Sequence, residues 1–315
     1  MKIVFLGTPE FSVPSLEAIA GAGHDIDLVL TQPDRPRGRK SAPAAPPVKR
    51  AAQALDLHVQ QPESVNEPAT VAELHRLRPD VMVVVAFGQI LGRKVIEAPK
   101  IACLNVHASL LPKYRGAAPV PAAILNGETE TGVTVQKVVR KLDAGDILRR
   151  RATRIGPGET AGELLKRLSL IGAELLVESL ESIAAGTAVF TPQDGSQATY
   201  APMLDKSDGL IDWTRDAEYI ERHVRAMSPW PGAFTFLVRD ANPLRLLITK
   251  ASVVPAVEQV DPGLIYEVGQ DGFSVAAGSA GVRIERLHPA GKKEMTAAEF
   301  ARGYRLNAGE RLASG

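Results

Sequence analysis

The sequence predicts an α/β fold, in which a domain with a parallel-rich sheet is followed by a small β-barrel domain. Short strands that are apolar on both faces, such as Lys2–Leu6 and Val81–Ala86, alternate with helical segments in the first half of the chain. Strands of this kind belong to parallel sheets that helices cover on both sides. After Asp208 the chain changes to short β-like runs between Asp, Asn, Pro and Gly turns, which is typical of a small barrel or sandwich.

The first half of the chain can be divided into elements by its apolar runs and its helix boundary signals. The first helix, within Ser12–Gly23, opens with a cap residue and a proline and ends in glycines. The later elements are the strand Asp25–Leu30, the helix Thr70–Leu77, the strands Val81–Ala86, Ala102–Val106, Gly132–Val139 and Asp146–Arg154, and the helix Glu159–Ala185. Ligands bind at the carboxyl ends of such parallel strands, so we expect the segments after Leu6, Val85 and Leu104 to meet in one cleft.

The second half of the chain begins with a turn-rich stretch from Thr191 to Asp208, which is the best candidate for a linker. The β-like runs beyond it are Phe234–Val238, Leu244–Val254, Gly263–Val268, Gly272–Ala277 and Val282–Leu287. We therefore expect a first domain at residues 1–189, a linker at 190–207 and a C-terminal β-barrel domain at 208–315.

Composition excludes several classes of protein. The 315 residues include 37 Lys and Arg against 36 Asp and Glu, so no global field attracts the chain to nucleic acid or membrane. The single cysteine, Cys103, excludes an intramolecular disulfide and a multi-cysteine zinc site, and we expect it to be a small buried apolar residue in a reduced, cytoplasmic protein. The apolar run Val81–Phe87 is far shorter than the roughly 20 residues of a spanning helix.

One internal stretch, Pro33–Arg50, is unusually basic and rich in proline. Its cations are Arg35, Arg37, Arg39, Lys40, Lys49 and Arg50, against the single acid Asp34. Five prolines predict the absence of regular structure here. Cations clustered on an otherwise neutral chain favour a polyanion as partner, and a solvated insertion is the alternative.

The residues that suggest chemistry follow the strand at Ala102–Val106. Asn105 and His107 are two positions apart, so on a strand their side chains share a face and can approach one oxygen. Asp143 lies in a glycine-containing turn, and a carboxylate beside a histidine can orient its ring. Donors aimed at an oxygen that becomes negative are what acyl transfer needs. A hydrogen-bonded structural histidine is the alternative, and two ligands are too few for a zinc site, so we predict no metal.

Several segments carry a resemblance to a known family. They are Ile3–Ser12, Thr31–Pro36, Leu104–Pro119, Thr131–Val135, Leu142–Asp146 and Trp230–Gly232. Over essentially its whole length the chain resembles the methionyl-tRNA formyltransferase family. The combination of Asn-x-His, Ser-Leu-Leu-Pro and Leu-Asp-x-Gly is similar to the shared core of the formyltransferases that depend on 10-formyltetrahydrofolate.

The resemblance implies a Rossmann-like formyltransferase domain followed by an OB-like barrel. It implies that Asn105, His107 and Asp143 are catalytic. The residues it implies for folate binding are Ser109, Leu110, Leu111, Pro112, Phe87, Gly88, Gln89, Ile90 and Leu91. We assign the cations Arg35, Arg37, Arg39 and Lys40 to the acceptor stem of a tRNA. The C-terminal domain carries 13 Lys and Arg against 14 Asp and Glu from Asp208 onward, so its own tRNA-contacting residues are not assigned.

The implied reaction transfers the formyl group of 10-formyltetrahydrofolate to the α-amine of methionine on initiator tRNA, for translation initiation. We expect a monomer, because no exposed apolar stripe stands out. Other acceptors in the same chemistry are an amino sugar nucleotide or glycinamide ribonucleotide. Outside this chemistry, a dinucleotide-dependent oxidoreductase is disfavoured because Gly7–Pro14 lacks the G-x-G-x-x-G pattern. A non-catalytic RNA-binding module leaves the catalytic trio unexplained.

Overall fold

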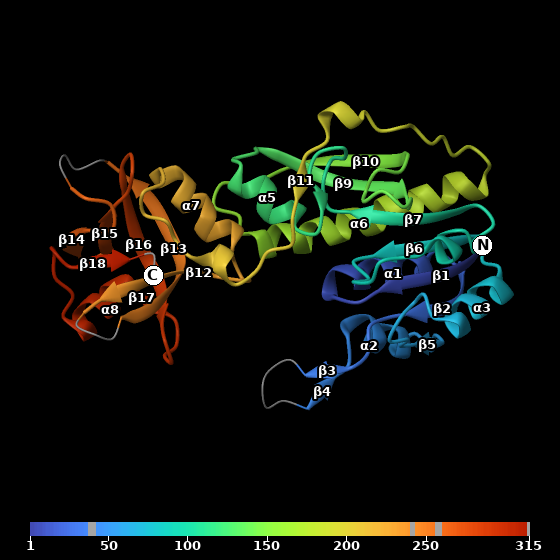
Figure 1. Ribbon diagram of the computed structural model, residues 1–315, viewed down its shortest axis with the longest axis horizontal. Coiled ribbons are helices and arrows are strands. Elements are labelled where there is room, and N and C mark those ends of the chain that lie inside the picture. The colour runs from blue at the N-terminus through green and yellow to red at the C-terminus, as the bar shows by residue number, and fades with distance from the viewer. Residues whose placement is uncertain (37–41, 240–242, 256–259, 314–315) are drawn as a thin grey trace. The chain divides into compact units, whose positions relative to one another are not determined.

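The computed structural model describes residues 1–36, 42–239, 243–255 and 260–313 (Figure 1). Its contacts divide the chain into two compact units. Unit 1 comprises Met1–Pro119, Glu130–Arg154 and Leu165–Ala201. Unit 2 comprises Val120–Thr129, Ile155–Leu164 and Pro202–Gly315. The domain boundaries drawn from the sequence, after residues 189 and 207, stay a prediction.

Unit 1 is built on a seven-stranded sheet with the order β10-β9-β7-β6-β1-β2-β5. The strands are β1 (Lys2–Gly7), β2 (Asp25–Leu30), β5 (Val59–Gln60), β6 (Val81–Val85), β7 (Ala102–His107), β9 (Glu130–Lys137) and β10 (Ile147–Arg154). The five strands from β5 to β7 run parallel, whereas β9 and β10 add an antiparallel edge. The predicted parallel-rich sheet is confirmed.

Helices cover both faces of this sheet, as the apolar strands predicted. The helices are η1 (Glu10–Ser12), α1 (Val13–Gly21), α2 (Pro47–Ala54), α3 (Pro68–Leu77), α4 (Arg93–Ile96) and α6 (Ala161–Ala184). On one face, Leu74 of α3 belongs to a buried cluster with Leu6 and Met82 of the sheet. On the opposite face, α6 lies along the sheet (Figure 1). Gly172 of α6 closely approaches Val106 of β7 and Val133 of β9. Cys103 lies in the first cluster, so Asn105 and His107 share that face of β7.

The stretch from Pro33 to Arg50 corrects one expectation, because part of it has regular structure. A short hairpin pairs β3 (Arg35–Pro36) with β4 (Pro43–Ala44), and α2 begins at Pro47. Proline at the first position of a helix is favourable, since its missing N–H has no helical partner there and its fixed φ suits the helix. Proline density in the described part of this stretch therefore marked the start of a helix.

Unit 2 contains an antiparallel sheet with the order β14-β15-β16-β13-β12-β18, with β17 paired to β16. Its elements are α5 (Pro119–Leu125), η3 (Ser207–Gly209), α7 (Ala217–Ala226), β12 (Ala233–Val238), β13 (Leu244–Val254), β14 (Ile265–Gly269), β15 (Gly272–Ala276), β16 (Gly281–Pro289), β17 (Met295–Thr296), α8 (Ala297–Tyr304) and β18 (Arg311–Ala313). A bridge between Leu264 and Arg311 joins the two ends of the sheet and closes it into a small barrel, as predicted. Within the described ranges, no helix combines the length and apolar character that crossing a bilayer requires.

Candidate active site

The loops that follow the parallel strands meet at the carboxyl edge of the sheet in unit 1. Thr8, which follows β1, donates through its hydroxyl to the carbonyl oxygen of Phe87, at 2.7 Å, and Gln32, which follows β2, donates to the same oxygen at 3.3 Å. Phe87 and Leu91, beyond β6, share a buried cluster with Cys103 of β7 and Val138, which follows β9. The predicted meeting of the segments after Leu6 and Val85 is confirmed, and that the segment after Leu104 joins them in one cleft stays a prediction.

The three predicted catalytic residues lie together in unit 1. Asn105 and His107 are on β7, and Asp143 is in the turn between β9 and β10. The Asn105 amide nitrogen is 3.5 Å from Asp143 Oδ1, and His107 Nδ1 is 3.7 Å from Asp143 Oδ2. The side chains of His107 and Asp143 are 7% and 13% exposed, so their interaction is shielded from bulk water.

A backbone contact fixes the tautomer of His107. Its Nε2 lies 2.9 Å from the carbonyl oxygen of Tyr114, which can only accept a hydrogen bond. The Nε2 atom of neutral His107 therefore carries the proton. The other nitrogen, Nδ1, faces Asp143, and it becomes a donor when the ring takes a second proton.

Asp143 accepts hydrogen bonds at both carboxylate oxygens. The backbone N–H of Gly116 donates to Oδ2 at 2.9 Å, and the Gln136 amide donates to Oδ1 at 3.0 Å. The backbone of Asp143 has a φ of 46°, in the left-handed region. Close beside it, Gly145 must be glycine, because a Cβ there would overlap the carbonyl oxygen of Lys137. The turn is thus built to present this carboxylate.

Sequence reasoning missed four residues that support the trio: Thr134, Gln136, Arg115 and Gln193. In the antiparallel register of β7 and β9, Gln136 lies beside Asn105 and Thr134 beside His107. A signal for Thr134 and Gln136 was present, because these two polar residues alternate with the apolar Val133 and Val135 on the strand. Arg115 and Gln193 contact each other across 78 residues of sequence, which no local pattern indicates.

The predicted folate loop at Ser109–Pro112 is held by internal hydrogen bonds. The Ser109 hydroxyl donates to the carbonyl oxygen of Lys113, and Thr134 bonds both Ser109 and Leu111 through their backbone atoms. Ser109 and Leu111 are fully buried, whereas Leu110 and Pro112 are partly exposed. Of the two leucines, Leu110 therefore has side-chain surface to offer a ligand.

The second predicted folate segment, Phe87–Leu91, combines a fixed backbone with an exposed apolar side chain. Gln89 accepts from the Val65 N–H at 2.6 Å, and the carbonyl oxygen of Ile90 accepts from the Asn66 amide at 2.8 Å. Phe87 is buried, Gly88 has a positive φ of 87°, and the Ile90 side chain is 89% exposed. An anchored loop with an open apolar side chain is suited to contact an apolar ligand surface.

Of the four cations predicted to bind tRNA, only Arg35 belongs to the described part of the chain. It is exposed and lies 3.6 Å from Glu63, where solvent screens the ion pair. Arg37, Arg39 and Lys40 lie outside the described residues.

Cys103 is a buried apolar residue, as expected. It is 4% exposed on β7, and burial raises the pKa of its thiol to about 12. A thiol of this kind is inert at neutral pH, because the thiolate is the nucleophile. Where the chain is described, His, Cys, Asp and Glu form no group of three or more that could hold a metal ion.

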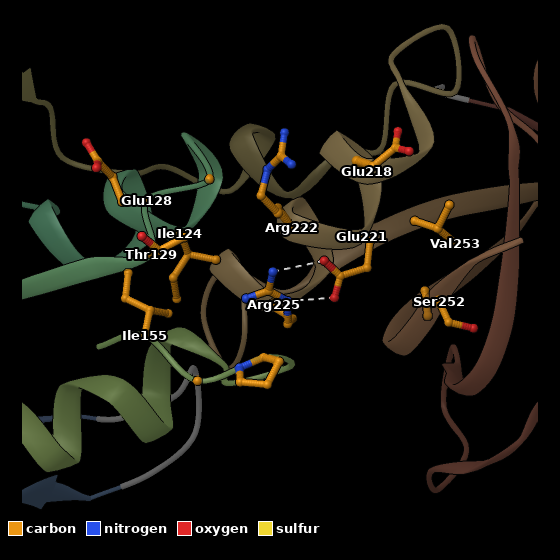
Figure 2. Close-up of a pocket in the computed structure, with 14 residues that line it drawn as sticks. Ile124, Glu128, Thr129, Ile155, Glu218, Glu221, Arg222, Arg225, Ser252 and Val253 are labelled. Atoms are coloured by element: carbon orange, nitrogen blue, oxygen red, sulfur yellow. Dashed lines mark hydrogen bonds and ion pairs between the residues drawn. The ribbon is translucent and has the colours of Figure 1, made fainter. Parts of the chain in front are cut away.

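Unit 2 contains a cavity of its own (Figure 2). It is lined by α7, β13 and the segments around Thr129 and Gly156, and none of the predicted site residues lines it. Figure 2 shows Arg225 paired with Glu221, at 2.6 and 2.9 Å. Arg225 also donates to the carbonyl oxygen of Glu159. The contact to Glu159 joins α7 to the segment Ile155–Leu164 of unit 2.

Comparison with known proteins identifies the family of this chain. The formyl transferase family model matches residues 1–180, and the model of the formyl transferase C-terminal domain matches residues 203–305. Among solved structures, an N-formyltransferase from Helicobacter canadensis, in complex with folinic acid and dTDP-3-aminofucose, superposes with a TM-score of 0.68 at 19% identity. The match covers 91% of this chain and 100% of that one. At this identity the likeness shows the fold alone.

Relatives of known name are much closer in sequence. The methionyl-tRNA formyltransferase of Geobacter sulfurreducens is 47% identical over 312 residues, covering 99% of this chain and 96% of the relative. That of Solibacter usitatus is 48% identical over 315 residues, covering 100% and 99% respectively. The chain therefore belongs to the formyl transferase family, in the group whose members include these methionyl-tRNA formyltransferases.

Proposed function

We propose that this protein transfers the formyl group of 10-formyltetrahydrofolate to the α-amino group of methionine on initiator methionyl-tRNA. The observation that carries the proposal is the grouping of Asn105, His107 and Asp143 in a chain that is 47% identical over nearly its full length to a methionyl-tRNA formyltransferase. We also infer a cytoplasmic monomer that acts in translation initiation, with a formyltransferase domain at residues 1–189 and a tRNA-binding barrel at 208–315.

The geometry supports a direct transfer between two bound substrates. The neutral α-amine attacks the formyl carbon, and the formyl oxygen takes up negative charge. Asn105 donates to this oxygen through its amide, and protonated His107 donates through Nδ1, since Nε2 is bonded to Tyr114. The attacking nitrogen loses a proton while the folate N10 gains one as it leaves. Asp143 stabilises the imidazolium and is placed to carry that proton.

Two groups of residues are proposed to bind the substrates. The partly exposed side chains of Leu110 and Ile90 offer apolar surface for the folate, and the fixed backbones of Ser109–Pro112 and Phe87–Leu91 hold them in place. The cations from Arg35 to Lys40 would contact phosphates of the acceptor stem, because guanidinium groups bind phosphate bidentately. Holding both substrates at one edge of the sheet supplies proximity.

The test is a formylation assay with purified protein, 10-formyltetrahydrofolate and either charged initiator tRNA or a dTDP-linked amino sugar. We expect formyl-methionyl-tRNA and no formylated sugar. His107→Ala and Asp143→Asn should fold normally, checked by thermal unfolding, and lose roughly 10²–10³ in kcat, because each removes stabilisation of the developing charge. Formylation of the sugar alone would assign the acceptor differently, and near-wild-type turnover in either variant would remove that residue from the mechanism.

A further inference from the structure

We propose that Gln193 is a positioning residue that holds the Asp143 turn in its working orientation, and that Arg115 in turn fixes Gln193. The inference rests on the proposed function, because it gives Asp143 a role in the transfer. Gln193 follows α6, in the stretch that the sequence indicated as a linker, and the mechanism above does not use it. Its side chain nevertheless contacts the Asp143 turn directly, at the carbonyl oxygens of Asp143 and Gly145.

The contacts of Gln193 form a continuous chain from a cation to the catalytic carboxylate. Arg115 donates to Gln193 Oε1 through Nε at 3.2 Å and through Nη2 at 2.7 Å. Gln193 Nε2 lies 3.0 Å from Gln136 Oε1, and Gln136 Nε2 donates to Asp143 Oδ1 at 3.0 Å. The same Gln193 nitrogen lies 2.9 Å from the carbonyl oxygen of Asp143 and 2.7 Å from that of Gly145. Gln193 therefore touches both the backbone of the turn and the neighbour of its carboxylate.

The orientation of both amides in this chain is determined by its ends. A guanidinium can only donate, so Oε1 of Gln193 must face Arg115 and Nε2 must face the acceptors. An ionised carboxylate can only accept, so Nε2 of Gln136 must face Asp143 and Oε1 must face Gln193. The two requirements agree, and aligned hydrogen bonds of this kind polarise one another. The chain thus presents an N–H to Asp143 Oδ1 and opposes rotation of the carboxylate.

Burial makes this arrangement expensive to rearrange. Arg115 is 2% exposed and Gln136 is 1% exposed. A buried polar group left without its partner costs far more than an exposed one. Flipping either amide would set oxygen against oxygen at one end and N–H against N–H at the other, so the observed orientation is held.

The backbone around Gln193 is anchored on both sides. Thr191 exchanges two backbone hydrogen bonds with Ile147 of β10, each 2.8 Å long. On the other side, β11 (Tyr200–Ala201) pairs in parallel with β8 (Arg115–Gly116). That pairing places Ala201 beside Gly116, whose N–H donates to Asp143 Oδ2. The segment from Thr191 to Ala201 therefore supports Asp143 through both of its carboxylate oxygens.

The test is a double-mutant cycle between Gln193 and Asp143, measured as kcat and KM for both substrates. Gln193→Glu keeps the shape but replaces the donating amide with an acceptor that faces the carbonyl oxygens of Asp143 and Gly145. It should lower kcat by roughly ten- to a hundredfold, as expected for a displaced catalytic group, with both KM values within about twofold of wild type. In an Asp143→Asn background the same substitution should change kcat by less than about twofold, because the group it positions is already gone.

Gln193→Met, which removes the bonds without adding charge, repeats the cycle and carries the test if Gln193→Glu fails to fold. Gln197 provides the matched control, because it is exposed, lies on the same segment and bonds only the exposed Asp194 among the described residues. Gln197→Met should behave as wild type. The positioning role is overturned if the kcat losses of the Gln193 and Asp143 variants multiply in the double variant. It is also overturned if substitution of Gln193 changes KM and leaves kcat unchanged. An inactive wild type would instead overturn the proposed function, so the two failures are distinguishable.

Discussion

At the scale of single residues, hydrogen-bond donors and acceptors decide what each side chain can do. His107 donates a hydrogen bond from Nε2 to the carbonyl oxygen of Tyr114, so Nδ1 is the nitrogen that can act on the substrate. Asp143 receives N–H groups at both oxygens. Histidines elsewhere in the chain have different surroundings and different roles. His223 is the clearest case, because it is buried in unit 2 and takes no part in the proposed reaction.

His223 predicts a pH dependence of stability. Burial lowers the pKa of its imidazole, outweighing the hydrogen bond that its Nε2 forms with the carbonyl oxygen of Asp208 at 2.7 Å. The ring therefore takes up a proton less readily in the fold than in the unfolded chain, which is protonated below about pH 6.5. The stability that goes with this group is complete above that pH and is lost as the pH falls toward the lowered pKa of the folded state.

The measurement is the free energy of unfolding by urea at pH 7.5 and at pH 5.5. Wild type should be less stable at pH 5.5, and His223→Gln should show a smaller loss between the two pH values. Some pH dependence should remain, because burial also lowers the pKa of His24. His58→Gln, at an exposed position, is the control and should keep the wild-type difference. An equal loss in wild type and His223→Gln would assign the dependence to other groups.

At the scale of elements, the sequence was informative where hydrophobic pattern alone decides the structure. The strands β1, β2, β6 and β7 in the sheet centre were predicted because each is a short apolar run between turn residues. The helices α7 and α8 were not predicted, because the segments around them are short β-like runs and both helices were included in the predicted β domain. A signal for α8 was present: Thr296 and Glu299 form a capping box at its start.

Some features of the candidate site could likewise be predicted from local sequence pattern, and others could not. The shared face of Asn105 and His107 follows from the period of a strand, so it could be predicted. The burial of Leu111 next to a partly exposed Leu110 could not be predicted, because it depends on which side of the loop is covered by β9. Gln136 required the register of β7 with β9, and Gln193 required the return of the chain after α6. Contacts between residues that are far apart in the sequence cannot be predicted from a local pattern.

The Ser109–Pro112 loop gives a prediction that separates binding from folding. Leu110→Asp should raise KM for 10-formyltetrahydrofolate several-fold, because it places a charge on partly exposed apolar surface at the proposed pocket. Leu111→Asp should instead destabilise the protein by several kcal/mol, since Leu111 is fully buried and a buried unpaired carboxylate is costly. Steady-state kinetics and thermal unfolding of both variants make the comparison. Unchanged folate kinetics in a folded Leu110→Asp would move the pocket away from this loop.

At the scale of the whole molecule, charge is balanced and tRNA must therefore be attracted locally. The net charge is +1, and the residues from Asp208 onward carry 13 Lys and Arg against 14 Asp and Glu. A uniform field cannot then guide a polyanion to the protein. The stretch Pro33–Arg50 is the exception, with six cations and one acid. Of its cations, Lys49 is bound internally to Asp34 at 2.8 Å, and Arg50 to Glu10 at 3.1 Å. The cations from Arg35 to Lys40 are the candidates for the acceptor stem, and Arg35 makes a longer contact than Lys49 and Arg50 do, at 3.6 Å from Glu63.

Replacing Arg35, Arg37, Arg39 and Lys40 by Ala should weaken tRNA binding and flatten its dependence on salt. Each phosphate contact that is lost should lower the slope of log Kd against log salt concentration by roughly 0.7–0.9. Folate KM should stay unchanged, because one folate tail cannot neutralise four cations. A control variant removes as many cations elsewhere in unit 1, at Arg76, Arg93, Lys94 and Lys100, where Arg76, Arg93 and Lys100 pair with acids. Both variants change the net charge equally, so a general electrostatic field would lower the salt slope of tRNA binding by the same amount in each. Direct contact predicts a lower slope only in the variant at Arg35, Arg37, Arg39 and Lys40. If the variant at Arg35, Arg37, Arg39 and Lys40 keeps the tRNA affinity and the salt slope of the wild type, these cations belong to a solvated insertion that does not bind tRNA.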